Sequence, residues 1–122
     1  MKTKKPEYKC KFRHYRNINI SGSINSRGGA TLAFTDDAKV SGEKFFAGSI
    51  AYCNVKDNYN KAYGRAKSHG LLVKHASGNF RHLADCVAAT GEPRHFLVEG
   101  DDMKRFLAIV DEEMEESGFA PR

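Results

Sequence analysis

The sequence predicts an α+β fold in a single domain spanning residues 1–122, with an antiparallel β-meander of about three to five strands packed against two or three helices. The length suits one domain of ordinary size, and the composition, 40% hydrophobic and 29% charged, is typical of a globular protein. Polar and apolar residues alternate in the first half of the chain, as they do in strands. In the second half the apolar residues recur at helical spacing.

The N-terminal part of the chain alternates in two successive stretches. Residues 1–7 precede them and are expected to form a flexible segment. Residues 8–15 alternate strictly and predict a strand whose basic face, with Lys11 and Arg13, is exposed to water. Residues 18–24 alternate again, and turn residues follow them before the next apolar segment. The pattern therefore predicts a hairpin in this region.

The middle of the chain predicts a buried strand. After a turn at Asp36–Asp37, residues 45–53 are almost continuously apolar, which is typical of a central strand covered on both faces. The Phe45–Phe46 pair within this strand fits either the core or an interface between subunits.

A helix is predicted immediately after this strand, over residues 55–69. Asn54 and Asp57 are placed to cap its first turn, and Gly70 is placed to end it. The segment 71–73 is short and apolar, which favours a short strand after the helix.

The C-terminal part predicts two helices around a strand. Residues 81–89 suit a short helix, and residues 95–98 suit an edge strand. The last helix has a continuous apolar stripe, an N-cap at Asp101 or Asp102, and a stop at Gly118.

Charge is distributed unevenly along the chain. The net charge is +5, but residues 101–122 carry seven acidic and three basic residues, so the rest of the chain has a net charge of +9. A basic region of this kind attracts phosphates or acidic proteins, although a solvated basic surface explains it equally well. The acidic residues at 111–116 oppose the helix dipole, which indicates either fraying or a basic partner.

The composition predicts a cytoplasmic protein without cofactors. Cys10, Cys53 and Cys86 are far apart and form no CxxC pair, which favours reduced thiols over disulfides or a structural zinc site. No apolar run is long enough for a membrane span or a signal peptide. The five histidines have no metal-ligand spacing, and no catalytic motif is present, so we expect neither a metal site nor catalytic residues.

A candidate anion site lies at the predicted junction of strand and helix. On the helix, Lys61 and Arg65 fall on one flank of the apolar stripe and Lys56 falls on the other. Gly64 lowers helix stability and therefore indicates a close approach of another element. The arrangement fits a phosphate or nucleotide, and it equally fits a surface arginine beside a tightly packed glycine.

A second candidate lies at Arg27–Gly28–Gly29. Consecutive backbone amides in a glycine-rich segment can bind a phosphate together with the arginine. A hairpin turn with a solvated arginine accounts for the same residues.

The stretch Cys53–Leu71, with the pattern Cys-Asn-x-Lys-Asp-x-Tyr-x-Lys-x-x-Gly-Arg-Ala-x-x-x-Gly-Leu, resembles small phage-encoded accessory proteins. It is most similar to the Thoeris anti-defence sponge family, which sequesters cyclic ADP-ribose-type signalling nucleotides. This resemblance implies a non-enzymatic homo-oligomer, a hexamer in members of the family, with pockets shared between protomers and lined by arginines and aromatic residues.

The resemblance also implies which residues bind the ligand. By position these are Asn54, Lys56, Asp57, Tyr59, Gly64 and Arg65. Arg27 and Arg94 are implied as further phosphate contacts, and Lys61 joins them from its place on the helix flank.

The resulting hypothesis is a phage anti-defence protein in the host cytoplasm that sequesters a cyclic nucleotide, of the ADP-ribose type or an oligonucleotide, without cleaving it. One alternative is a phage inhibitor that docks on a host defence protein, such as a CRISPR or restriction effector, by charge complementarity. Another is a small accessory protein that binds nucleic acid.

Overall fold

The computed structural model of the protein describes residues 10–19, 21–25, 27–40, 43–75, 81–90, 92–98 and 102–121. The predicted flexible segment 1–7 lies outside these residues. In chain order the elements are β1 (Lys11–Asn17), β2 (Arg27–Val40), β3 (Glu43–Asn58), α1 (Lys61–His75), β4 (Arg81–His82), α2 (Leu83–Thr90), β5 (His95–Val98), α3 (Met103–Glu116) and β6 (Phe119–Pro121).

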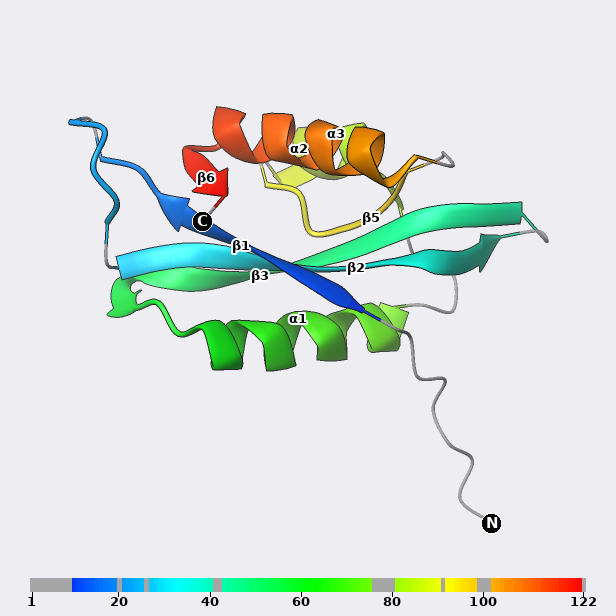
Figure 1. The fold of residues 1–122 in the computed structure, drawn as a ribbon, viewed down its shortest axis with the longest axis horizontal. Coiled ribbons are helices and arrows are strands. Elements are labelled where there is room, and N and C mark those ends of the chain that lie inside the picture. Colours follow the sequence, from blue (N-terminus) through cyan, green and yellow to red (C-terminus); the bar gives the residue numbers. More distant parts are fainter. Residues whose placement is uncertain are drawn as a thin grey trace, which may run out of the picture.

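The described strands form one six-stranded sheet in the order β4-β5-β3-β2-β1-β6. Helix α1 covers one face of this sheet, and α2 and α3 cover the other (Figure 1). Strands β1, β2 and β3 form the predicted antiparallel meander, and of the pairings in the sheet only β4 with β5 is parallel. The α+β class is therefore confirmed, with more strands than the sequence predicts.

The basic face of β1 is exposed to water at Lys11, as predicted, but Arg13 on the same face is half-buried against α3. The side chain of Arg13 donates two hydrogen bonds to the carboxylate of Asp111 in α3, at 2.9 and 2.7 Å. The fully buried Tyr15 donates a third to the same carboxylate at 2.7 Å. The local sequence pattern does not predict the contact between Arg13 and Asp111, because the two residues are 98 positions apart in the chain.

Two predictions about turns are wrong. Ile18 and Ile24 form one isolated bridge in the connection between β1 and β2, so the strands of the hairpin are β1 and β2. Strand β2 also continues through Asp36–Asp37 to Val40, because one extra residue between Thr35 and Ala38 is accommodated as a β-bulge.

The predicted helix at 55–69 begins and ends later than expected. Strand β3 keeps its pairing with β2 as far as Asn58, so Asn54 and Asp57 do not cap a helix. Asn60 does, because its side-chain oxygen accepts a hydrogen bond from the backbone N–H of Tyr63 at 3.0 Å.

Helix α1 also continues through Gly70 and through the predicted strand at 71–73. Leu72 is buried on the sheet against Ala33 and Ala47, and this packing outweighs the low helix propensity of glycine.

In the C-terminal part, the predicted helix at 81–89 is shortened because Arg81–His82 pair with β5 as the short strand β4. The predicted strand at 95–98 is confirmed, but it is not an edge strand, since β4 lies outside it. Asp102 caps α3 by accepting a hydrogen bond from the N–H of Lys104 at 3.0 Å, and Gly118 follows the helix with a φ of 87°.

Large side chains fill the space between the sheet and α3. Phe46 of β3 stacks on Phe106 of α3 with ring centroids 5.1 Å apart, and Phe34 and Phe96 pack around the same ring. Phe46 and the apolar stripe of α3 therefore belong to the core of one chain.

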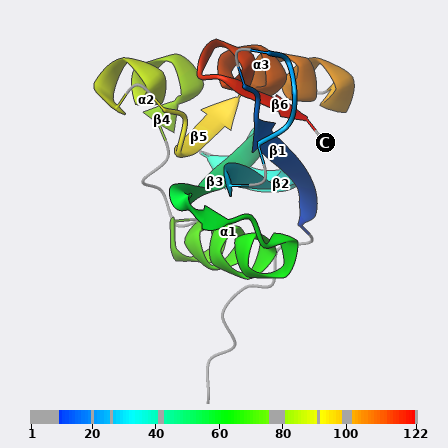
Figure 2. The ribbon, with the colours of Figure 1, turned by 90° about the vertical axis from the view of Figure 1, so that its left-hand side faces the viewer.

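The face covered by α1 has small side chains, and the helix lies close to the strands (Figure 2). Thr31, Ala33 and Ser49 are fully buried on this face. A Cβ atom at Gly64 would collide with the Thr31 hydroxyl, so the close approach predicted at this glycine is confirmed.

Candidate functional site

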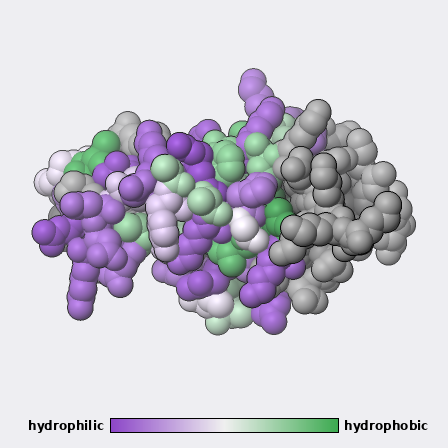
Figure 3. Space-filling view, turned by 90° about the horizontal axis from the view of Figure 1, so that it is seen from below, coloured by the Kyte–Doolittle hydropathy of each residue, from purple (hydrophilic) through white to green (hydrophobic). Residues whose placement is uncertain are grey.

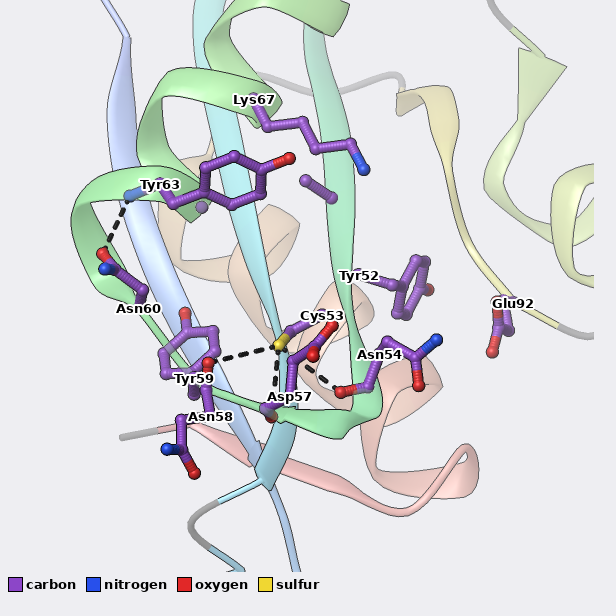
Figure 4. A pocket seen from close by; sticks show the side chains of 12 residues that line it. Tyr52, Cys53, Asn54, Asp57, Asn58, Tyr59, Asn60, Tyr63, Lys67 and Glu92 are labelled. Atoms are coloured by element: carbon purple, nitrogen blue, oxygen red, sulfur yellow. Dashed lines mark hydrogen bonds between the residues drawn. The ribbon is translucent and has the colours of Figure 1, made fainter.

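A cavity of about 780 Å³ opens between β3 and the first half of α1 (Figure 4). Strand β5 pairs with β3 only over Phe46–Ser49, so among the described strands the later part of β3 has no neighbour on that side. The cavity lies beside this later part. Its lining residues are Ala51, Tyr52, Cys53, Asn54, Asp57, Asn58, Tyr59, Asn60, Tyr63, Gly64, Lys67 and Glu92.

One wall of the cavity is an irregular segment of β3, which we call the Asn54–Asp57 bulge. Cys53 pairs with Gly29 of β2, and Asn58 pairs with Arg27, so β3 advances by more residues than β2 between these two pairs. The extra residues are displaced from the ladder, and the side chains of Asn54 and Asp57 line the cavity.

The bulge has internal contacts that fix its shape. The thiol of Cys53 lies 3.6 to 3.7 Å from the carbonyl oxygens of Asn54, Asp57 and Asn58 (Figure 4). The side-chain oxygen of Asn54 accepts a hydrogen bond from the backbone N–H of Lys56 at 2.9 Å. These contacts make the bulge an ordered Asx turn rather than the first turn of a helix.

Tyr59 supplies an aromatic wall next to the bulge. Its ring packs on Gly29, where an added Cβ would lie 2.8 Å from the ring, and Gly29 has a φ of 135° that other residues rarely adopt. The guanidinium of Arg16 lies over the Tyr59 ring at 4.8 Å from its centroid. These contacts fix the plane of the ring.

The Tyr59 hydroxyl is held by a network below α1. It donates to the carbonyl oxygen of Ala30 at 2.9 Å and lies 2.6 Å from the hydroxyl of Thr31 and 2.7 Å from Nδ1 of His14. The Tyr59 hydroxyl donates its single proton to the carbonyl oxygen of Ala30. Its oxygen therefore accepts hydrogen bonds from Thr31 and His14, and neutral His14 carries its proton on Nδ1. Burial raises the pKa of Tyr59.

His14 remains neutral over a wider pH range than a free histidine. Its pKa is lowered first by burial and then by the positive charges of Lys61 and Arg65. Lys61 and Arg65 were both predicted to bind ligand. In the structure, their positive charges further lower the pKa of His14 in the hydrogen-bond network beneath Tyr59.

The opposite wall comes from the first turns of α1. Tyr63, 66% exposed, and Lys67 lie one turn apart, and in Figure 4 both side chains extend over the cavity. Asn60 lies at the N-terminus of the helix, and the first turn contains no acidic residue. The helix dipole therefore adds positive potential to that of the lysine.

The far rim is formed by Tyr52, Glu92 and Arg94. Tyr52 donates a hydrogen bond to the carbonyl oxygen of Pro93 at 2.6 Å, and burial raises its pKa. Arg94 lies over the Tyr52 ring, 5.6 Å from the centroid, and pairs with Glu92 at 3.5 Å.

The structure brings together only part of the predicted site. Asn54, Asp57 and Tyr59 line the cavity, and the exposed Lys56 belongs to the same bulge. Arg94 reaches the rim through Tyr52.

The other predicted residues lie outside the cavity. Arg27 pairs with Asn58 across the sheet, and Lys61 lies at the start of α1. Arg65 lines a separate, smaller cavity of about 420 Å³ with Cys10, Phe12, Ala66 and His69. The sequence does not point to Tyr63, because α1 packs on the sheet through Gly64, Ser68 and Leu72 and this leaves Tyr63 66% exposed beside the cavity. Lys67 falls at a position that the resemblance leaves open, so it is not among the predicted ligand residues.

Among the described residues, no group of three or more His, Cys, Asp or Glu side chains could hold a metal ion. All three cysteines are free thiols. Within the same residues, no helix has both the length and the apolar character that crossing a membrane requires. The sequence matches no protein-family model, no curated protein and no solved structure.

Proposed function

We propose that this protein binds a small signalling nucleotide in the cavity between β3 and α1 and sequesters it without cleaving it. The observation that carries the proposal is the lining of the cavity, where aromatic rings, side-chain amides and one lysine occur together. Its volume of about 780 Å³ falls within the range of roughly 300 to 1,000 Å³ usual for small-molecule sites.

The aromatic and amide residues fit the base of a nucleotide. Tyr63 of α1, whose side chain is 66% exposed, offers a ring face on which a base can stack. Tyr59, in the link between β3 and α1, closes the neighbouring wall with a ring that Gly29 and Arg16 hold in place. Asn54, Asn58 and Asn60 provide both donors and acceptors for the polar edge of a base.

The α1 wall fits the phosphate. Lys67 contributes a positive charge inside the cavity, and the first turn of α1 contributes the positive end of its dipole. A phosphate placed between them leaves the base near the tyrosines.

Sequestration needs a site that holds the ligand and no reaction, so the proposal assigns no catalytic residue. The resemblance of Cys53–Leu71 to anti-defence sponges supports a cyclic nucleotide as the ligand and a phage protein that acts in the host cytoplasm. It also supports a homo-oligomer, in which a second protomer extends the walls of the cavity.

Native mass spectrometry tests the proposal. The purified protein is measured with and without a mixture of cyclic mono-, di- and trinucleotides and cyclic ADP-ribose isomers. We expect an oligomer that gains discrete masses of one nucleotide each. A protein that gains no mass with any of these compounds contradicts the proposal.

Variants then locate the site. Tyr63→Ala and Lys67→Ala are each expected to weaken binding about 10-fold or more, since stacking on one aromatic ring contributes roughly 1 to 3 kcal/mol. Lys74→Ala is the matched control, because Lys74 is exposed on α1 but does not line the cavity. Equal affinity in all three variants would place the ligand elsewhere.

A second candidate function is suggested by the outer surface of α1. Hydrophilic side chains cover much of the coloured surface on this side (Figure 3), and α1 contains four lysines and arginines but no acidic residue. This surface fits an acidic region of a host defence protein. Co-purification with such a protein, unchanged by added nucleotide and lost with Arg65→Glu, would favour this function.

A further inference from the structure

Asp57 places a carboxylate in the lining of the cavity that the phosphate site does not explain. The described residues form two ion pairs, Arg13 with Asp111 and Arg94 with Glu92. Glu92 therefore has Arg94 as a partner, whereas Asp57 forms an ion pair with none of the described cations. An unpaired carboxylate repels a phosphate, so Asp57 suits a different part of the ligand.

The backbone that carries this carboxylate is held by the Asn54–Asp57 bulge. The Cys53 thiol lies 3.7 Å from the carbonyl oxygen of Asp57, and Asn54 binds the backbone N–H of Lys56 on the other side of the turn. A carboxylate presented on an ordered backbone loses less conformational freedom when it binds a ligand.

Asp57 and Lys67 approach the cavity from opposite sides. Asp57 belongs to the bulge of β3 and Lys67 to α1, and Figure 4 shows both side chains directed into the space between these elements. They do not pair with each other. The cavity therefore has a hydrogen-bond acceptor, the Asp57 carboxylate, at one end and a cation, the Lys67 ammonium group, at the other.

We propose that Asp57 binds the ribose hydroxyls of the nucleotide, so that the cavity selects ribonucleotides with a phosphate at the Lys67 end; this inference rests on the proposed function. A ribose with free 2′ and 3′ hydroxyls, as in AMP, has two neighbouring donors, and a carboxylate has two acceptor oxygens that match them. The negative charge of Asp57 also disfavours a chain of several phosphates that extends towards it.

Isothermal titration calorimetry of the full chain with AMP, 2′-deoxy-AMP and ATP tests this inference. We expect AMP to bind about 10-fold or more tightly than 2′-deoxy-AMP, because hydrogen bonds to a charged acceptor are among the stronger ones. We also expect ATP to bind no more tightly than AMP, despite its larger negative charge.

Two variants separate hydrogen bonding from charge. Asp57→Asn and Glu92→Gln each remove one negative charge from the cavity lining. In Asp57→Asn the affinities for AMP and 2′-deoxy-AMP are expected to become nearly equal. In Glu92→Gln the preference for AMP is expected to remain. Because Asp57 is exposed, the fold should tolerate the change, and circular dichroism checks this.

The outcomes distinguish this inference from the proposed function. Equal affinities of the unmodified protein for AMP and 2′-deoxy-AMP overturn the role of Asp57 and leave nucleotide binding intact. The same is true if Glu92→Gln abolishes the preference as fully as Asp57→Asn. Failure of AMP, 2′-deoxy-AMP and ATP to bind overturns this inference, whereas the proposed function is overturned only if the cyclic compounds of the mass-spectrometry mixture also fail to bind.

Discussion

The two faces of the sheet are built from side chains of different size. Towards α3 the strands present Phe34, Phe46 and Ile50, which interlock with Phe106 in a continuous apolar core. Towards α1 they present small and hydroxylated residues such as Thr31. The same strands therefore serve two purposes, since alternate residues point to opposite faces.

Because of this difference, the α3 face contributes mainly to the stability of the fold, and the α1 face forms the proposed binding cavity. Large apolar side chains exclude water from the α3 face, and their burial provides most of the free energy of folding. The small residues of the other face allow α1 to lie close at Gly64, while polar side chains remain at its N-terminal end, where the cavity opens. Variants on the two faces should therefore differ in what they change.

The largest expected effect is on the α3 face. Phe106→Ala removes a fully buried ring that contacts three other aromatic rings, and we expect the free energy of unfolding to fall by about 3 to 5 kcal/mol in urea denaturation. Tyr63→Ala on the outside of α1 is the control, expected to change it by less than about 0.5 kcal/mol. Similar losses in the two variants would contradict the division between the faces.

Two glycines of α1 provide a matched pair. Gly64→Ala forces a methyl group against the Thr31 hydroxyl, so we expect a loss of roughly 1 to 3 kcal/mol despite the better helix propensity of alanine. Gly70→Ala meets nothing within 4 Å and should gain up to about 1 kcal/mol. Thermal unfolding of both variants measures the difference. A stabilising Gly64→Ala would show that α1 moves away from the sheet at little cost.

The polar contact between β1 and α3 is expected to have a smaller effect. Asp111→Asn keeps the shape of the side chain but removes the charge that binds Arg13 and accepts from Tyr15. Because both ion-pair partners are partly exposed, we expect a loss of about 1 to 2 kcal/mol by chemical denaturation. Glu112→Gln, one residue further on and exposed, should change stability much less.

The smallest expected effect is a dependence on pH through His14. Its pKa is lowered in the folded protein, so the unfolded chain takes up the proton first as the pH falls below about 6.5. Stability should therefore decrease as the pH falls through this range and recover as it rises. His14→Gln should flatten that part of the curve of melting temperature against pH. An unchanged slope would show that other groups cause it.

The elements that sequence analysis predicts well are those whose packing follows a simple period. Residues 45–53 form the core of β3, and α3 has both its cap at Asp102 and its stop at Gly118 where the pattern predicts them. In these segments local pattern and tertiary packing agree, so a single sequence is sufficient.

The errors lie where contacts distant in sequence decide the structure. Asn54 and Asp57 have the composition of a helix cap, yet pairing with β2 keeps them in the bulge of β3. Only some of the predicted site residues, among them Tyr59 and Asp57, therefore line the cavity. Tyr63 and Lys67 were missed because their direction depends on the packing of α1 against the sheet through Gly64, Ser68 and Leu72.

The pairing of β1 with β6 has a consequence for biosynthesis. These strands are the first and last described elements of the chain, and they lie side by side in the sheet (Figure 1). While the chain is still emerging from the ribosome, the meander can form, but Arg13 and Tyr15 have no partner until α3 appears. The fold therefore closes late in translation, and a chain that stops before α3 leaves one face of the meander uncovered and prone to aggregate.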